Sequence, residues 1–211
     1  MEREINMNEV SDGRLYTAND LVKADCQGCT GCSACCKGMG SSITLDPLDV
    51  FRLCEAAGCG FETLLDTRVE LNIVDGMILP NLKMSGPEES CTFLDGQGRC
   101  SVHPYRPGIC RLFPLGRIYE DGDFRYFLQV HECPKKKTKV KVKKWLDTPD
   151  LARYEQFVRD WHYYLKDLQK QTEKDPARIK ELSMDVLRRF YMLPYDRNRG
   201  FYEQFYERFR R

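Results

Sequence analysis

The sequence predicts an α+β fold, in which a small, loop-rich cysteine-cluster domain with short hairpins is followed by a helical C-terminal extension. Two contrasts in composition predict this organisation. All 11 cysteines lie between positions 26 and 133, together with 13 of the 15 glycines and six of the ten prolines. Beyond position 134 the chain has a single glycine, and its apolar residues recur at helical spacing.

These contrasts divide the chain into four segments. We assign residues 1–25 to an N-terminal segment, 26–134 to the cysteine-cluster domain, 135–147 to a lysine-rich strand or linker, and 148–211 to the helical extension. The third segment contains KKKTKVKVKK, with seven lysines in ten residues. Its alternation favours an edge strand whose lysines block further pairing, rather than an RNA-binding patch.

The cysteine-cluster domain is predicted to contain one clear helix. Asp46 is a suitable N-cap, Pro47 occupies the first helical position, and Gly58 follows the last turn. Residues 61–71 add a second helix or a turn.

Three turn signals flanked by apolar residues predict three short hairpins. They are Asp75-Gly76, the DGQG run at 95–98, and the EDGD run at 120–123. Such dipeptides adopt the turns that join antiparallel strands.

Three helices are predicted in the extension. Thr148 is expected to cap the first, with Pro149 at its first position and an apolar stripe of Leu151, Tyr154, Val158, Trp161, Leu165 and Leu168. The second covers about 176–192, and the third carries Phe201, Phe205 and Phe209 at intervals of four. These faces should pack on the cysteine-cluster domain or on a protein partner.

Charge and hydropathy argue against a membrane partner and against nucleic acid drawn by overall charge. The 33 basic residues nearly balance the 32 acidic ones, so no overall field attracts nucleic acid. No stretch reaches the roughly 18 apolar residues of a membrane span, and the start lacks the pattern of a secretory signal. We therefore expect a cytoplasmic protein, where so many cysteines indicate metal rather than disulfides.

The first cysteine run, CQGCTGCSACC, contains Cys26, Cys29, Cys32, Cys35 and Cys36. Without Cys35 it has the C-x2-C-x2-C-x3-C spacing of bacterial ferredoxins, with Lys37 where their run ends in proline. Neighbouring side chains of an extended chain point to opposite faces, so one member of the Cys35-Cys36 pair can serve a second site.

Four further cysteines lie downstream. Cys91 and Cys100 bracket the DGQG turn, which should bring them together, and Cys110 and Cys133 can complete a four-thiolate site. Such a site carries a net charge of about −2 that needs nearby donors. Arg106 and Arg111, which flank Cys110, are the candidates to contact the bound cofactor.

The segments CTGCSACC (29–36) and CTFLDGQGRCSVHPYRPGICRLFP (91–114), followed by Cys133, resemble the YkgJ-type cysteine-cluster family. This family has a C-x2-C-x2-C-C signature and is regarded as a zinc- or iron-chelating domain. The resemblance implies eight metal ligands, namely Cys29, Cys32, Cys35, Cys36, Cys91, Cys100, Cys110 and Cys133. Cys26 is an additional candidate, which leaves the exact membership of the first site open.

The leading expectation is therefore a metal-binding protein that ligates an iron–sulfur cluster, 4Fe-4S ahead of other types, or zinc. A structural zinc module that binds protein or nucleic acid is one alternative, and a cluster- or zinc-dependent redox or modifying enzyme is another. No pattern of nucleophile, histidine and acid predicts a particular reaction. Cys54 and Cys59 are expected to be packing thiols, and His103 and His131 to lie outside the ligand set.

Overall fold

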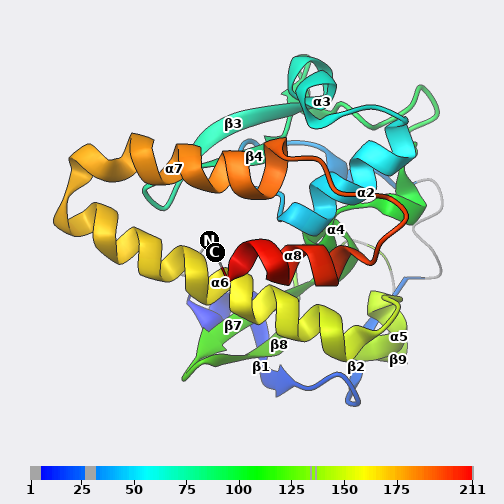
Figure 1. Ribbon diagram of the computed structural model, residues 1–211. Helices are drawn as coiled ribbons and strands as arrows, with labels where there is room; N and C mark the ends of the chain where they lie inside the picture. Colours follow the sequence, from blue (N-terminus) through cyan, green and yellow to red (C-terminus); the bar gives the residue numbers. More distant parts are fainter. Residues whose placement is uncertain (1–5, 27–31, 134, 136, 211) are drawn as a thin grey trace.

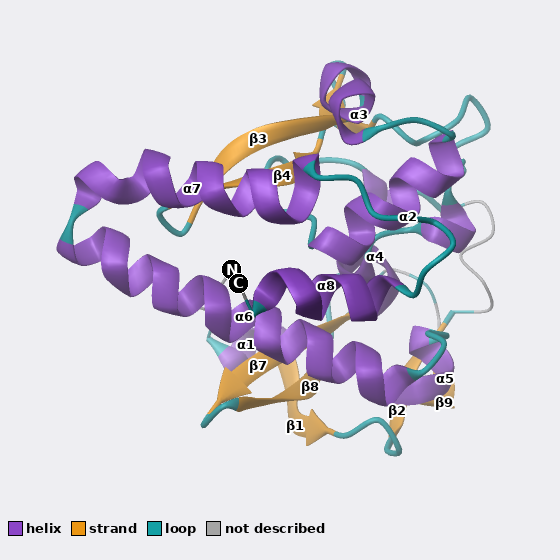
Figure 2. Ribbon diagram, in the orientation of Figure 1, coloured by secondary structure: helices purple, strands orange, loops and turns teal. Residues whose placement is uncertain are grey.

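The computed structural model describes residues 6–26, 32–133, 135 and 137–210 and confirms the α+β fold. A layer of helices lies between a β-hairpin and a three-stranded sheet (Figure 1; Figure 2). The helices of this layer are α2 (Pro47–Ala57), α6 (Leu151–Lys174), α7 (Ile179–Leu187) and α8 (Phe201–Phe209). The hairpin is β3 (Val69–Val74) with β4 (Met77–Leu82), and the sheet, in the order β1-β8-β7, contains β1 (Ser11–Tyr16), β7 (Leu115–Glu120) and β8 (Asp123–Gln129).

One hydrophobic core joins the cysteine-rich part of the chain to the helical extension. Of its 26 buried residues, 11 come from α6, α7, α8 and the turn that follows α7. Phe157 and Phe205 are fully buried, and their ring centroids lie 4.7 Å apart. The Tyr191 hydroxyl donates a hydrogen bond of 2.9 Å to the Leu45 carbonyl. The extension therefore packs on the cysteine-rich part, while a separate protein partner for it stays a prediction.

Two of the three expected hairpins are confirmed with the predicted turns. Asp75 and Gly76 both have positive φ, 48° and 76°, between strands β3 and β4, which pair from Val69↔Leu82 to Val74↔Met77. The β7–β8 turn repeats this geometry at Asp121 and Gly122. Both are the turns whose twist matches that of the flanking strands.

The expectation of a hairpin around the DGQG run is wrong, because the segments before and after this run do not form a pair of strands. The strand β6 (Ser90–Cys91) pairs instead with β5 (Met84–Ser85), and the 95–98 turn closes only a single bridge, Leu94↔Cys100. The Asp95 carboxylate accepts the backbone N–H groups of Gln97 and Arg99 at 2.9 Å each. The Asp95 side chain thus occupies backbone N–H groups of the loop, so few of them remain to form hydrogen bonds with a neighbouring strand.

The N-terminal segment pairs with the three-stranded sheet through one strand and with the lysine-rich segment through another. After α1 (Met7–Val10), β1 pairs with β8, and β2 (Leu21–Asp25) pairs with β9 (Thr138–Lys141). Within the segment expected to be a lysine-rich strand or linker, only residues 138–141 form a strand, and residues 142–146 form α5 (Val142–Leu146). Val142 and Leu146, one helical turn apart, are both buried in a second, smaller core beneath this sheet.

The expected start of the long helix is also wrong. Thr148 does not cap it; its hydroxyl donates to the Leu146 carbonyl at the end of α5. Asp147 and Asp150 have positive φ values of 44° and 47°, so the helix begins only at Leu151. The predicted second helix is divided into η3 (Pro176–Arg178), α7 and a π-helical turn, η4 (Arg188–Met192), and α8 matches the third. None of the helices in the described residues is long and apolar enough to cross a membrane.

Candidate metal centre

Cysteines from six separate segments either line one pocket or pack against the main core. Cys26 follows β2, Cys32 precedes the 3₁₀ turn η1 (Ala34–Cys36), which contains Cys35 and Cys36, and Cys91 ends β6. Cys100 follows the 95–98 turn, Cys110 lies in α4 (Gly108–Leu112), and Cys133 follows β8. Cys29, a predicted ligand, lies outside the described residues.

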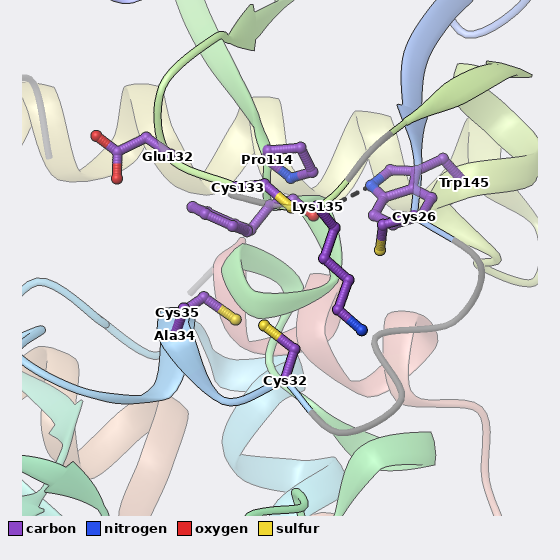
Figure 3. Close-up of a pocket in the computed structure, with 10 residues that line it drawn as sticks. Cys26, Cys32, Ala34, Cys35, Pro114, Glu132, Cys133, Lys135 and Trp145 are labelled. Atoms are coloured by element: carbon purple, nitrogen blue, oxygen red, sulfur yellow. Dashed lines mark hydrogen bonds between the residues drawn. The ribbon is translucent and has the colours of Figure 1, made fainter.

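Four of these cysteines line one pocket, which we call the pocket group: Cys26, Cys32, Cys35 and Cys133. Figure 3 shows Cys32 and Cys35 on one wall and Cys26 and Cys133 on the opposite wall, with Lys135 extending between them. Phe113, Pro114 and Trp145 add an apolar side to the pocket. The Trp145 indole N–H donates to the carbonyls of Leu112 and Phe113 at 3.2 Å each, which fixes the ring against the thiols.

The other four thiols, which we call the core group, pack against the main hydrophobic core: Cys36, Cys91, Cys100 and Cys110. The bridge Lys37↔Ser90 and the hydrogen bond from Gly38 N–H to the Glu89 carbonyl hold η1 against β6. These contacts set Cys36 beside Cys91. The Leu94↔Cys100 bridge returns Cys100 to the same place, since the Leu94 N–H also donates to the Cys91 carbonyl.

The helix α4 that carries Cys110 is held by a residue that the sequence did not single out for this role. Asp49 Oδ1 accepts the Gly108 N–H at 2.7 Å, across 59 residues of chain. Asp49 also completes the capping box of α2, because it accepts the Asp46 N–H while Asp46 accepts the Asp49 N–H. The D-P-L-D spacing predicts the capping box, but no local signal reveals the second partner.

Gly108 must be a glycine in this arrangement. A Cβ atom at this position would lie 2.2 Å from the Tyr154 hydroxyl oxygen, a distance that no side chain can occupy. The helix α4 therefore approaches α6 through bare backbone, and α2, α4 and α6 jointly set the position of Cys110.

Burial and mutual repulsion disfavour the thiolate form of the core group in the absence of a cation. Burial raises the pKa of Cys91 and Cys100, and it raises the pKa of Cys110 well above the usual range, with further increases from neighbouring thiols. Cys36 donates a hydrogen bond to Cys35, which raises the pKa of Cys36 and lowers that of Cys35 to about 7. A soft metal cation would remove this penalty, so the donor set suits zinc or iron–sulfur ligation.

The two arginines predicted to contact the cofactor have different surroundings. The hydrogen bond from Cys36 has the largest effect on the pKa of Cys35, and burial has the largest effect on the pKa of Cys100. The positive charge of Arg106 lowers the pKa of both thiols. Arg106 Nε is buried and has no hydrogen-bond partner among the described residues. Its position suits a donor to a bound centre. Arg111 Nε is likewise buried without a partner among the described residues, but its terminal nitrogens donate to the carbonyls of Asp147 and Pro104. Arg111 therefore links α4 to Pro104 and to the residue that follows α5.

The two other cysteines and the three histidines do not line the pocket. Cys54 and Cys59 also pack against the main core, and Cys54 has Cys59 as a neighbouring thiol. The His103 ring lies 2.5 Å from Arg106 Nη1, and His162 stacks on Tyr119 with the ring centroids 3.5 Å apart. His131 is absent from the pocket lining.

The thiols do not converge on a single point. Among the residues that the structure describes, no three Cys, His, Asp or Glu side chains are placed to hold one metal ion.

Comparison with known proteins agrees with this concentration of thiols. No curated protein and no solved structure gives a match to the chain. Residues 28–134, just over half of the chain, match the CxxCxxCC family, which is described as a "putative zinc- or iron-chelating domain". The matched span contains eight of the nine cysteines predicted as ligands and ends one residue after Cys133. The chain therefore belongs to the CxxCxxCC family of cysteine-cluster domains.

Proposed function

We propose that this protein binds an iron–sulfur cluster through its clustered cysteines, in preference to zinc. The observation that carries the proposal is the gathering of eight described cysteines, from segments up to about a hundred residues apart, around one pocket and one adjoining patch of core. Thiols distributed for packing alone would have no reason to meet. The family match supports zinc or iron as the metal.

One feature favours a cluster over a single zinc ion, and two features suit a bound centre of either kind. The first cysteine run contains the ferredoxin spacing, which is the feature that favours a cluster. The described thiols lie on opposite walls of one pocket (Figure 3). The buried Nε of Arg106, like that of Arg111, has no partner among the described residues and can donate to a bound sulfide or thiolate.

The residues of the chain would serve such a centre in distinct ways. Thiolates supply the ligands, Arg106 offsets part of their negative charge, and Phe113 and Trp145 keep water from one side of the pocket. When bound, an iron–sulfur cluster supplies one-electron redox chemistry or structural cross-linking. Nothing in the described residues selects a reaction, so enzymatic activity is no part of the proposal.

Anaerobic purification followed by metal and sulfide analysis tests the proposal directly. We expect iron and inorganic sulfide in about equal amounts, together with broad visible absorption that bleaches on reduction. Zinc without sulfide would favour the structural zinc module instead. A chain that retains neither metal after growth with both iron and zinc would overturn metal binding altogether.

A further inference from the structure

The two thiols outside the candidate ligand set, Cys54 and Cys59, flank the end of helix α2. Gly58, which ends this helix, has a left-handed backbone with a φ of 64°. Its N–H donates to the Glu55 carbonyl at 3.3 Å, and the Cys59 N–H donates to the Cys54 carbonyl at 3.2 Å. These two hydrogen bonds define a Schellman motif, in which the chain turns back over the last turn of its helix.

The motif places the two thiols beside each other. The residues at the positions of Cys54 and Cys59 in a Schellman motif commonly contact each other through apolar side chains. Both cysteines pack against the main core. Burial, and then the neighbouring Cys59 thiol, raise the pKa of Cys54. Two thiols thus stand where such a motif usually has an apolar pair.

The end of α2 is open to small molecules in solution. Both cysteines are half-buried, and the glycines on either side of Cys59, Gly58 and Gly60, are exposed. Arg197 lies against the same turn, because its guanidinium donates to the Cys54 carbonyl at 3.5 Å. A positive charge beside a half-buried thiol favours the thiolate, which is the form that exchanges with disulfides.

The pair is separate from the candidate metal ligands. Neither Cys54 nor Cys59 lines the pocket. Their number is also too small, because a closed zinc site or a cubane cluster needs about four ligands. Metal bound to the candidate ligands would therefore leave these two thiols available for reaction.

We propose that Cys54 and Cys59 form a reversible disulfide, which makes the end of α2 a redox-sensitive modification site. The oxidant is a low-molecular-weight disulfide of the glutathione class. In a reducing compartment such a cross-link forms transiently, in response to the redox state. It would fix the junction between α2 and α3 (Phe61–Thr67), which contains the motif. This inference does not depend on the proposed function.

The reaction is a thiol–disulfide exchange in two steps. The thiolate of Cys59, which has exposed neighbours on both sides, attacks one sulfur of glutathione disulfide and releases a first glutathione thiolate. The thiolate of Cys54 then attacks the Cys59 sulfur of this mixed disulfide and releases the second. Two protein thiols are oxidised and one glutathione disulfide is reduced. The two protons of the protein thiols pass through water to the two glutathione molecules.

A redox titration of the full-length protein, purified anaerobically with its metal, tests the proposal. The protein is brought to equilibrium in buffers with a series of ratios of glutathione to glutathione disulfide, and free thiols are then alkylated. Trypsin cleaves after Arg52 and Arg68, so one peptide, 53–68, contains both cysteines and no other. We expect this peptide to escape alkylation and to lose the mass of two hydrogen atoms as the buffer becomes more oxidising.

The contribution of the fold is measured against the synthetic 53–68 peptide in the same buffers. The equilibrium constant for the cross-link should be at least about tenfold larger in the folded protein, because the motif holds the two thiols in place before they react. The matched variants Cys54→Ser and Cys59→Ser should each show at most a mixed disulfide with glutathione at the remaining thiol.

Two outcomes would overturn the proposal. One is a 53–68 peptide from the folded protein that stays alkylated at both cysteines throughout the titration. The other is an equilibrium constant no larger in the folded protein than in the synthetic peptide. Iron, zinc and sulfide are counted in the same samples, so that the two proposals fail separately. A cross-linked protein that never held metal would refute the proposed function alone, and a metal-loaded protein without the cross-link would refute this inference alone.

Discussion

At the scale of single residues, the number of neighbouring thiols distinguishes Cys54 from the candidate ligand Cys110. Cys54 lies on α2 and packs against the main core, and burial raises its pKa to about 11. The candidate ligands are half-buried or buried too. Cys54 has Cys59 as a neighbouring thiol, whereas Cys110 has Cys35, Cys91 and Cys100. Exposure alone would not separate the two classes.

We predict that Cys54 reacts slowly with iodoacetamide in the folded protein. A thiol with a raised pKa stays protonated at pH 8, and only the thiolate reacts, so its alkylation should be on the order of 100-fold slower than in the unfolded chain. The rate should rise about tenfold for each pH unit and level off only above about pH 11. Mass spectrometry of the alkylated peptide measures both rates, and equal rates in the two states would contradict the prediction.

At the scale of secondary-structure elements, one carboxylate links α2 to α4. Asp49 is 2% exposed and accepts the backbone N–H groups of Asp46 and Gly108. Because Cys110 lies two residues after Gly108, the position of this thiol depends on a helix that contains no candidate ligand. We regard Asp49 as a positioning residue for the core group.

Asp49→Leu should destabilise the protein by about 1–3 kcal/mol for each buried N–H left without an acceptor. It should also reduce the metal bound by the core group. Asp49→Asn is the conservative control, because its amide oxygen can still accept the Gly108 N–H and should restore much of the metal. Urea unfolding and metal analysis measure the two effects; equal metal content in Asp49→Leu and the wild type would argue against a positioning role.

The pH dependence of stability offers a further check on Asp49. Burial raises the pKa of this carboxyl, so the folded protein keeps its proton to a higher pH than the unfolded chain does. The stability contributed by this group is therefore present at low pH and is lost as the pH rises through the folded-state pKa. Asp49→Asn should make the unfolding free energy less dependent on pH over this interval, and an unchanged profile would contradict the assignment.

At the scale of the whole molecule, the helical extension completes the main core. It contributes 11 of the 26 buried residues, and its α7 is joined to β4 by the hydrogen bond from the Ile78 N–H to the Ser183 hydroxyl. On the other side, the Arg117 guanidinium donates to the Tyr154 hydroxyl of α6 from the sheet. The helices are thus bound to both flanking β structures.

Truncation after Asp147 should yield a protein that aggregates. The change removes α6, α7 and α8 and exposes the apolar face of α2 and β4 that these helices cover. Truncation after Phe209 is the control and should behave as the full chain does. Size-exclusion chromatography and the soluble fraction after expression measure the outcome, and a monomeric, metal-loaded 1–147 fragment would refute the prediction.

Signals confined to a few neighbouring residues were sufficient to predict several elements. The Asp75-Gly76 and Asp121-Gly122 turns, the Asp46-Pro47 helix start and the Gly58 helix end are all as expected. Each depends on backbone conformations that particular residue types adopt wherever they occur. The concentration of cysteines likewise indicated the family and the kind of ligand before any geometry was known.

Long-range packing decided what these local signals could not. Whether residues 142–146 extend a strand or form α5 depended on a buried surface that Val142 and Leu146 could fill. The partner of Asp49 lies 59 residues away, and the neighbours of Cys35 and Cys36 depend on how η1 sits against β6 and the pocket. The sequence by itself determined the chemistry of the thiols and the local turns, and only the tertiary structure decided which thiols meet, because that depends on which distant surfaces pack together.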